Sequence, residues 1–140
     1  MMLLNSEGTD ELIPPEINAF EYRWLGGLAV SVLIAVLMFD YSASVVGVEV
    51  TLAINAFLFA TAVVLMFLVS RRRSNVARWL LAVPFNLLIL FYDVSHYGAM
   101  HGTWGADYLA PVRLALMAWA TWSLFTPAAS AWFSHRPLPD

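Results

Sequence analysis

Long segments without charge dominate the pattern of apolar and polar positions along this chain. Residues 50–70 and 114–134 contain no charged residue over 21 positions each, and 24–39 and 79–92 are shorter charge-free segments flanked by aromatics. A bilayer core of about 30 Å needs roughly 20 mostly apolar helical residues to cross it. The pattern therefore predicts an all-α membrane protein, a bundle of four transmembrane helices. The predicted spans are about 22–41, 49–70, 78–97 and 110–125.

The N-terminal part of the chain is polar and then changes to a helix signal. Residues 1–13 predict a polar, acidic tail, and residues 14–140 predict a single transmembrane domain. The sequence Pro14-Pro15-Glu16 predicts a helix start, because proline is tolerated in the first turn and a carboxylate there suits the helix dipole. We expect this helix to begin as a short interfacial segment and to run on into span one.

A second helix start follows span four. Thr126 and Pro127 read as an N-cap residue and a proline at the first helical position. This favours a break after Phe125 and a short interfacial helix over 127–133. The alternative is one kinked helix that continues to Phe133.

The predicted connections and span three carry further signals. Pro84 lies inside span three, where proline usually kinks a helix and is tolerated if neighbours satisfy the freed carbonyl. Residues 42–48 are expected to form a short loop between spans one and two. The glycine-containing segment 98–107 is expected to be the longest loop.

Composition leaves little room for a separate soluble domain. Hydrophobic residues make up 61 % of the chain, charged residues 12 %, and the mean hydropathy is +0.72. A soluble domain usually carries about 25 % charged residues. The absence of cysteine excludes thiolate nucleophiles, disulfide exchange and sulfur-ligated clusters. No basic and aromatic pattern outside the spans points to nucleic acid.

The basic residues predict the orientation. Four of them lie in the short connection between spans two and three: Arg71, Arg72, Arg73 and Arg78. Cytoplasmic loops are enriched in Lys and Arg, and short loops carry the most weight. With this loop inside, six of the seven arginines lie on the cytoplasmic side, and Arg113 is the exception. The prediction is a multi-pass protein whose N- and C-termini are both cytoplasmic.

Small residues recur along two spans. Gly27, Ser31 and Ala35 are spaced by four residues in span one, and Ala56 and Ala60 repeat the spacing in span two. Such stripes let another helix approach closely. They serve either packing within the chain or, in the sharper hypothesis, a Gly27/Ser31/Ala35 face that contacts a partner protein.

Polar residues inside spans are costly and therefore informative. At 1.5 Å per residue, Asn55, Asp93 and Arg113 each lie roughly 6–9 Å below the outer boundary. Asp93 and Arg113, at matched depth with opposite charge, are predicted to pair, with Asn55 in the same polar cluster. Asn86, Asp93 and Tyr97 are predicted to share a helix face. Asn86 is the only deeper polar residue on that face, which argues against a proton or ion path.

The histidines do not form a ligand signature. His96 and His101 lie five apart near the end of span three, whereas haem ligands usually come from two helices facing one cavity. We therefore predict no cofactor and no metal. The chain also lacks the common catalytic motifs of phosphate-binding loops, zinc proteases and serine hydrolases. We expect a protein that is not an enzyme.

Two segments resemble a known group. They are Ser70–Trp79, with the sequence SRRRSNVARW, and the closing Phe125-Thr126-Pro127 with Ala131-Trp132-Phe133. This combination resembles small four-span bacterial inner-membrane proteins of uncharacterised function. The resemblance implies four helices in a bacterial cell inner membrane and transfers no catalytic residue.

Small size, short loops and the small-residue stripe favour a non-catalytic accessory or assembly subunit of a larger membrane complex. The alternative is a small transporter or channel, which four short spans could form only as an oligomer. The expected partners are membrane lipids and either another membrane protein or further copies of the chain, and not nucleic acid.

Overall fold

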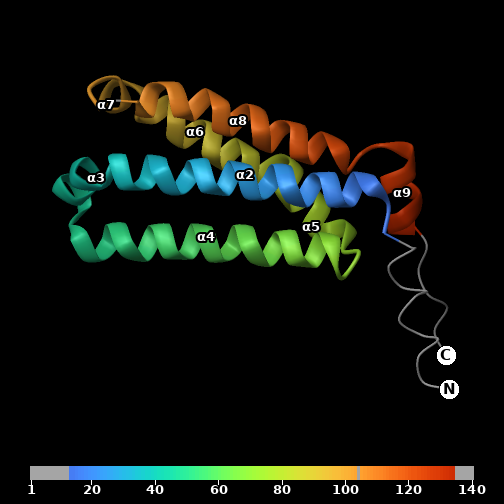
Figure 1. The fold of residues 1–140 in the computed structure, drawn as a ribbon. Coiled ribbons are helices and arrows are strands. Elements are labelled where there is room, and N and C mark those ends of the chain that lie inside the picture. The colour runs from blue at the N-terminus through green and yellow to red at the C-terminus, as the bar shows by residue number, and fades with distance from the viewer. Residues whose placement is uncertain (1–12, 104, 135–140) are drawn as a thin grey trace, which may run out of the picture.

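The computed structural model describes residues 13–103 and 105–134. Helix accounts for 88 % of these residues, and no strand occurs among them. The helices run back and forth along one common direction, joined by short connections (Figure 1). We call the end of the bundle that holds α3 and α7 the α3 end, and the opposite end, with α5 and α9, the α9 end.

The first long helix starts where the sequence predicts. α2 (Pro15–Leu37) follows Pro14, has Glu16 in its first turn and continues without a break into the predicted first span. It ends earlier than the predicted span 22–41, because the chain turns at Met38. A second helix, α3 (Phe39–Val46), then occupies most of the expected loop 42–48, so that loop prediction is wrong.

The second long helix is α4 (Val48–Ser70), which matches the predicted span 49–70 closely. Gly47, with φ of 91°, turns the chain between α3 and α4. This left-handed conformation suits glycine, since a Cβ would clash with the backbone.

A third rod consists of three consecutive pieces: α5 (Asn75–Leu80), the π-helical turn η1 (Leu81–Phe85) and α6 (Asn86–Ser95). The predicted distortion at Pro84 is present as this π turn. The side-chain amide of Asn86 donates to the carbonyl oxygens of Leu81, at 3.0 Å, and Ala82, at 3.4 Å. It also donates to Thr121 Oγ1 at 3.2 Å, which ties the distorted turn to a neighbouring helix.

The last part of the chain contains α7 (Tyr97–His101), α8 (Ala106–Ser123) and α9 (Pro127–Ser134). Six of the ten residues of the expected loop 98–107 are therefore helical, and the loop prediction is wrong for them. The predicted break after Phe125 is confirmed, and the alternative of one kinked helix to Phe133 is wrong. Thr126 Oγ1 accepts a hydrogen bond from the Ala129 N–H at 3.4 Å, as expected of an N-cap residue.

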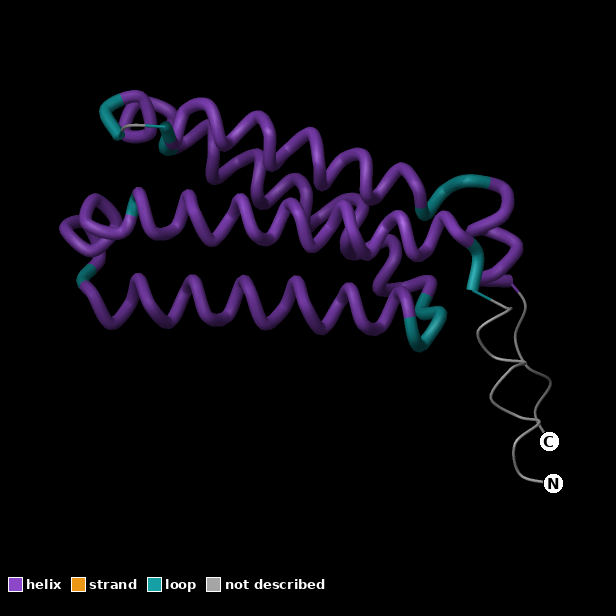
Figure 2. The backbone as a smooth tube through the Cα atoms, viewed as in Figure 1, coloured by secondary structure: helices purple, strands orange, loops and turns teal. Residues whose placement is uncertain are grey.

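α2 lies at the centre of the fold. α8 packs along one side of it and α4 runs along the other (Figure 2), and α6 packs against α8. The larger core lies toward the α9 end, where the Trp24 ring lies 5.8 Å from Phe20 and 5.6 Å from Phe85 between centroids. A smaller core at the α3 end includes Ile34, Met38 and Met100.

Three helical segments are long and apolar enough to cross a membrane: Pro15–Leu37, Val48–Ser70 and Asn75–Ser95. α8, which corresponds to the fourth predicted span, is not one of the three membrane-length helices found within the described residues. α8 has 18 residues, but Asp107, Arg113, Pro111 and several hydroxyl side chains lower its hydropathy.

Candidate functional site

Two opposite charges meet inside the helical part of the fold. Arg113 Nη2 of α8 donates to Asp93 Oδ1 of α6, and each residue is only 6 % exposed. The ion pair predicted from the sequence is thus present in the structure. α6 and α8 run side by side, so that residues 20 positions apart in the sequence reach one another.

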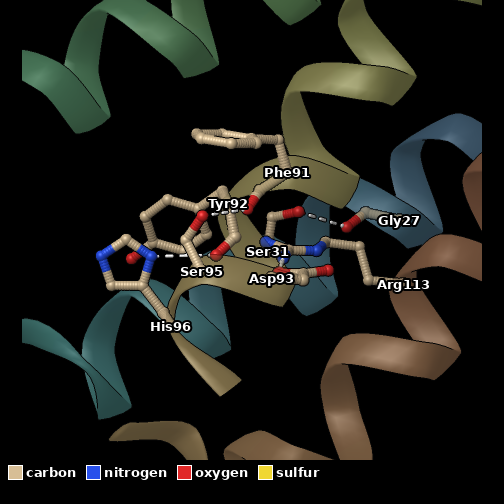
Figure 3. Close-up of polar contacts among 8 residues, drawn as sticks. All are labelled: Gly27, Ser31, Phe91, Tyr92, Asp93, Ser95, His96 and Arg113. Atoms are coloured by element: carbon tan, nitrogen blue, oxygen red, sulfur yellow. Dashed lines mark hydrogen bonds and ion pairs between the residues drawn. The ribbon is translucent and has the colours of Figure 1, made fainter. Parts of the chain in front are cut away.

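α2 adds a hydroxyl next to this pair. Ser31, Asp93 and Arg113 come from three different helices and point toward a common region (Figure 3). The Ser31 hydroxyl donates to the carbonyl oxygen of Gly27 at 2.9 Å within its own helix. The polar group at the centre is therefore the ion pair, with Ser31 beside it.

The ion pair leaves two buried polar atoms without a partner. Arg113 Nε and Asp93 Oδ2 have no hydrogen bond within the described residues. Arginine and carboxylate often form two parallel hydrogen bonds, but here a single contact joins them. A buried donor or acceptor without a partner is unfavourable. The site therefore has unused hydrogen-bonding capacity.

Arg113 also borders a groove. A space of about 450 Å³ lies among α2, α3, α4, α6 and α8; we call it the α2–α4 groove. Its lining includes Ser31, Asn55, Phe59, Tyr92 and Arg113. Arg113 is thus one of several polar residues in the lining of a mainly apolar space between helices.

Asn55 is not a direct member of the ion-pair cluster, and this part of the prediction needs correction. Its side-chain amide donates to the Thr51 carbonyl oxygen at 2.9 Å, within α4. Asn55 lines the α2–α4 groove on the α4 side, and no described hydrogen bond joins it to Asp93 or Arg113. Asn55 and Arg113 line the same groove, but they do so from different helices, α4 and α8.

The predicted face of Asn86, Asp93 and Tyr97 is also only partly correct. Asp93 is buried, whereas Tyr97 is 60 % exposed. α6 ends at Ser95 and the chain turns at His96, which breaks the helical spacing between Asp93 and Tyr97. The described hydrogen bonds of Asn86 go to Leu81, Ala82 and Thr121, and none of them reaches the ion pair.

His96 belongs to an aromatic group at the α3 end. Its ring stacks on Tyr92 with 4.2 Å between centroids, and its Nδ1 lies 2.9 Å from the Tyr92 carbonyl oxygen. Tyr41 of α3 meets the same ring edge-on at 6.3 Å. Residues 13–103 and 105–134 contain no group of three or more potential metal ligands. His96 itself lines the α2–α4 groove.

The stripe of Gly27, Ser31 and Ala35 does not form a free face toward a partner. Gly27 and Ser31 are buried inside the chain, and Ala35 lines the groove. A Cβ at Gly27 would lie 2.8 Å from Met117 Cγ of α8. The small residue is needed for close packing of α2 on α8, so the partner-facing hypothesis for this stripe is wrong.

Sequence reasoning missed the arginine contacts at the α9 end. Arg78 is in α5 and not in the preceding loop. Its Nη2 donates to Ser130 Oγ of α9 at 2.9 Å, and its guanidinium carbon lies 4.1 Å from the Phe125 ring centroid. Ser74, the N-cap of α5, is the signal that could have placed Arg78 inside the helix.

Arg23 makes a similar contact between α2 and α8. It donates to the Ser123 hydroxyl, and its guanidinium carbon lies 3.9 Å from the Trp119 ring centroid. Arg71 pairs with Glu21 at 3.5 Å. The arginines from which the orientation is predicted thus also form contacts between the ends of different helices. Arg136, which belongs to the same prediction, lies outside the described residues.

Comparisons with known proteins identify no relative: no protein family, curated protein or solved structure matches the chain. Two features of the chain itself bear on its function: the groove beside the buried ion pair and the uncovered surface of α4.

Proposed function

We propose that the chain is a small, non-catalytic integral membrane protein that serves as an accessory or assembly subunit of a larger membrane complex. Three of its four proposed spans are the long apolar helices α2, α4 and the α5–η1–α6 rod. α8 is the proposed fourth. Its 18 residues extend for about 27 Å. Arg113, the one charge in its body, is neutralised by Asp93, which lowers the cost of placing it in a membrane.

The distribution of arginines supports an orientation. Arg23, Arg71 and Arg78 make their contacts at the α9 end, whereas Arg113 lies toward the α3 end. Because cytoplasmic loops are enriched in arginine, we place the α9 end and both termini in the cytoplasm. The resemblance of the arginine loop to small bacterial proteins supports a bacterial inner membrane as the location.

The observation that carries the subunit proposal is the state of α4. Only 11 % of its most apolar window is buried by the rest of the chain. On the side of α4 opposite the groove, the exposed residues include Ala53, Ala56 and Ala60. Lipid chains do not require small residues, but a closely packed partner helix does. This alanine face replaces the Gly27 stripe as the proposed partner contact.

Site-specific photo-cross-linking in the native membrane tests the proposal. A photoreactive amino acid at Ala56 or Ala60 should give one discrete adduct with a different polypeptide. Val32 of α2, which is also exposed, is the matched lipid-facing control and should give none. The Ala56→Leu change should reduce recovery of that polypeptide with the purified chain several-fold, because bulk prevents close approach of the helices.

The α2–α4 groove favours a second candidate, a small oligomeric transporter or channel. The same experiment separates the two. An adduct of twice the mass of the chain at Ala56 would support a homo-oligomer and contradict the subunit proposal. If Ala56, like Val32, gave no polypeptide adduct, the subunit proposal and the oligomer proposal would both be contradicted, because lipid alone would then cover α4.

A further inference from the structure

The α9 end of the bundle carries an excess of positive charge. Among the described residues this end holds five arginines and two carboxylates: Arg23, Arg71, Arg72, Arg73, Arg78, Glu16 and Glu21. The ion pair described among them joins Arg71 Nη2 to Glu21 Oε1 at 3.5 Å. The described part of the chain therefore supplies fewer acidic partners at this end than it has arginines.

Arg72 is the arginine at this end that can bind an external anion. It lies in the connection between α4 and α5, is exposed, and makes no hydrogen bond or ion pair within the described residues. Arg78 adds a charge without a carboxylate, since its described side-chain hydrogen bonds go to Ser130 Oγ at 2.9 Å and Asn75 Oδ1 at 3.4 Å. Arg78 is only 8 % exposed, so it contributes its charge, whereas Arg72 can touch a ligand.

An apolar hollow begins three residues after Arg72, at Asn75. It has a volume of about 420 Å³ and lies against one face of α5 and η1; its lining is Asn75, Val76, Trp79, Leu80, Val83 and Pro84. We call it the α5 hollow. A helix rises by about 14 Å from residue 75 to residue 84, close to half of the roughly 30 Å of a bilayer core. The α5 hollow therefore extends through about one leaflet, starting at the arginine connection.

A lipid suits the α5 hollow better than a partner helix does. Its lining contains no glycine, alanine or serine, and the large side chains of Trp79 and Val83 are exposed. Close packing of helices in a membrane needs small residues, whereas a flexible acyl chain can follow an uneven apolar surface. The excess of arginines selects a head with a net negative charge, because phosphate oxygens accept charge-assisted hydrogen bonds from a guanidinium group.

We infer that the α5 hollow binds an anionic phospholipid, whose phosphate accepts a hydrogen bond from Arg72 and whose acyl chain packs along Trp79 and Val83. A zwitterionic phospholipid also carries a cation in its head, which the neighbouring arginines repel. This binding requires the proposed membrane placement, but neither a partner protein nor a particular orientation. The α5 hollow and the alanine face belong to different helices, so a failure of lipid binding would leave the cross-linking result at Ala56 as it stands.

Native mass spectrometry of the purified chain tests the inference. The chain is released from maltoside micelles that contain equal amounts of phosphatidylglycerol and phosphatidylcholine with the same acyl chains. One phosphatidylglycerol per chain should be retained, in about fivefold excess over phosphatidylcholine, because a single arginine near a membrane surface favours an anionic lipid by about this factor. Inorganic phosphate should not displace the lipid, since it has no acyl chain to fill the hollow.

Two arginine variants locate the head of the lipid. Arg72→Gln should reduce the retention of phosphatidylglycerol about fivefold. Arg71→Gln removes the same charge one position away and is the matched control. It should change the retention little, because Arg71 already pairs with Glu21.

Two tryptophan variants locate the acyl chain. Val83→Trp fills the α5 hollow and should reduce the retention of phosphatidylglycerol several-fold. Leu87→Trp, at an exposed position of α6 outside the hollow, should not. Thermal unfolding without added lipid checks that both variants are folded. If Val83→Trp is not folded, the comparison of Arg72→Gln with Arg71→Gln decides.

The inference is wrong if the two phospholipids are retained equally, or if Arg72→Gln and Arg71→Gln lose the same amount. Unchanged retention in a folded Val83→Trp variant would also overturn it. Two other occupants would give distinct results, each of which contradicts a lipid site. Displacement by inorganic phosphate would mean that the arginines hold a free anion.

The other occupant is the acidic N-terminal segment, which contains Glu7, Asp10 and Glu11. If phosphatidylglycerol is retained only after these three residues are changed to glutamine, the segment itself covers the arginines in the unaltered chain. If the unaltered chain already retains phosphatidylglycerol selectively, the segment does not occupy the site and the lipid does.

Discussion

At the scale of single residues, Asp93 and Arg113 illustrate what a charge in an apolar segment reveals. A charged side chain among apolar helices is costly, so each residue requires a partner, and their depths matched in the sequence. The sequence could therefore predict the contact. It could not predict that Arg113 Nε and Asp93 Oδ2 remain unpaired, because that depends on how α6 and α8 are rotated about their axes.

Breaking this pair on one side should destabilise the fold more than removing both charges. Asp93→Asn or Arg113→Gln alone should each lower the free energy of unfolding by about 3–5 kcal/mol, because the remaining buried charge has no partner. The double variant should lose less than either single variant. Thermal unfolding in detergent and a double-mutant cycle measure the difference.

Asn55→Ala is the control for this cycle. The one hydrogen bond that the Asn55 side chain makes within the described residues lies inside α4, so the loss of Asn55 should cost less than either single charge change. If the effects of Asp93→Asn and Arg113→Gln simply add, the two residues do not stabilise one another. Arg113 would then extend toward the lipid headgroups.

At the scale of helices, start signals in the sequence were more reliable than loop assignments. Pro15 and Thr126 marked the starts of α2 and α9 because proline and hydroxyl side chains act locally at a helix N-terminus. The segment 39–46 has no such signal and was expected to be largely loop, yet it forms α3. Short helices depend on packing for their stability, and packing is not visible in a local pattern.

The contact between α2 and α8 shows the same limit. A glycine at position 27 indicated close helix packing, but not which helix approaches it. The structure answers this, since Met117 of α8 occupies the space that a Cβ would need. The adjacent Gly26 has only an ordinary contact, 3.8 Å from a virtual Cβ to Leu116 Cδ1.

The two glycines should therefore respond differently to alanine. Gly27→Ala should destabilise the fold by about 1–3 kcal/mol, because the added methyl group forces α8 away from α2. Gly26→Ala should be neutral or slightly stabilising, since alanine favours a helix by about 1 kcal/mol over glycine. Thermal unfolding of both variants in the same detergent makes the comparison.

Met117 provides the check on the cause. Met117→Ala removes the side chain that Gly27→Ala would meet, so the double variant should lose less stability than the sum of the two single changes. Equal effects of Gly26→Ala and Gly27→Ala would show that helix propensity, and not close packing, determines the result.

At the scale of the whole molecule, hydropathy and charge predicted a helical bundle but not its interior. Three membrane-length helices follow from composition alone. The way in which the helices pack against one another does not follow from composition. It depends on contacts such as that of Arg78 with Ser130, which join residues far apart in the sequence. The α2–α4 groove depends on five helices at once, so no local pattern in the sequence could indicate it.

The orientation in the membrane is testable at this scale, and the absence of cysteine makes the test direct. Ser74→Cys marks the arginine loop between α4 and α5, and Gly102→Cys marks the connection between α7 and α8. The arginine loop should be cytoplasmic because positive residues are retained on that side. An impermeant thiol reagent on intact cells should then label Gly102→Cys and leave Ser74→Cys unlabelled.

The same two positions also test α8 as a span. After permeabilisation Ser74→Cys should become reactive, which shows that its thiol was shielded only by the membrane. A cysteine at Ala128 in α9 should behave like Ser74→Cys, because four spans return the chain to the cytoplasmic side. Labelling of Ala128→Cys on intact cells, together with Gly102→Cys, would mean that α8 does not cross. Arg113 and Asp93 would then join a surface helix to a three-span core, and the bundle would need a partner to cover α6.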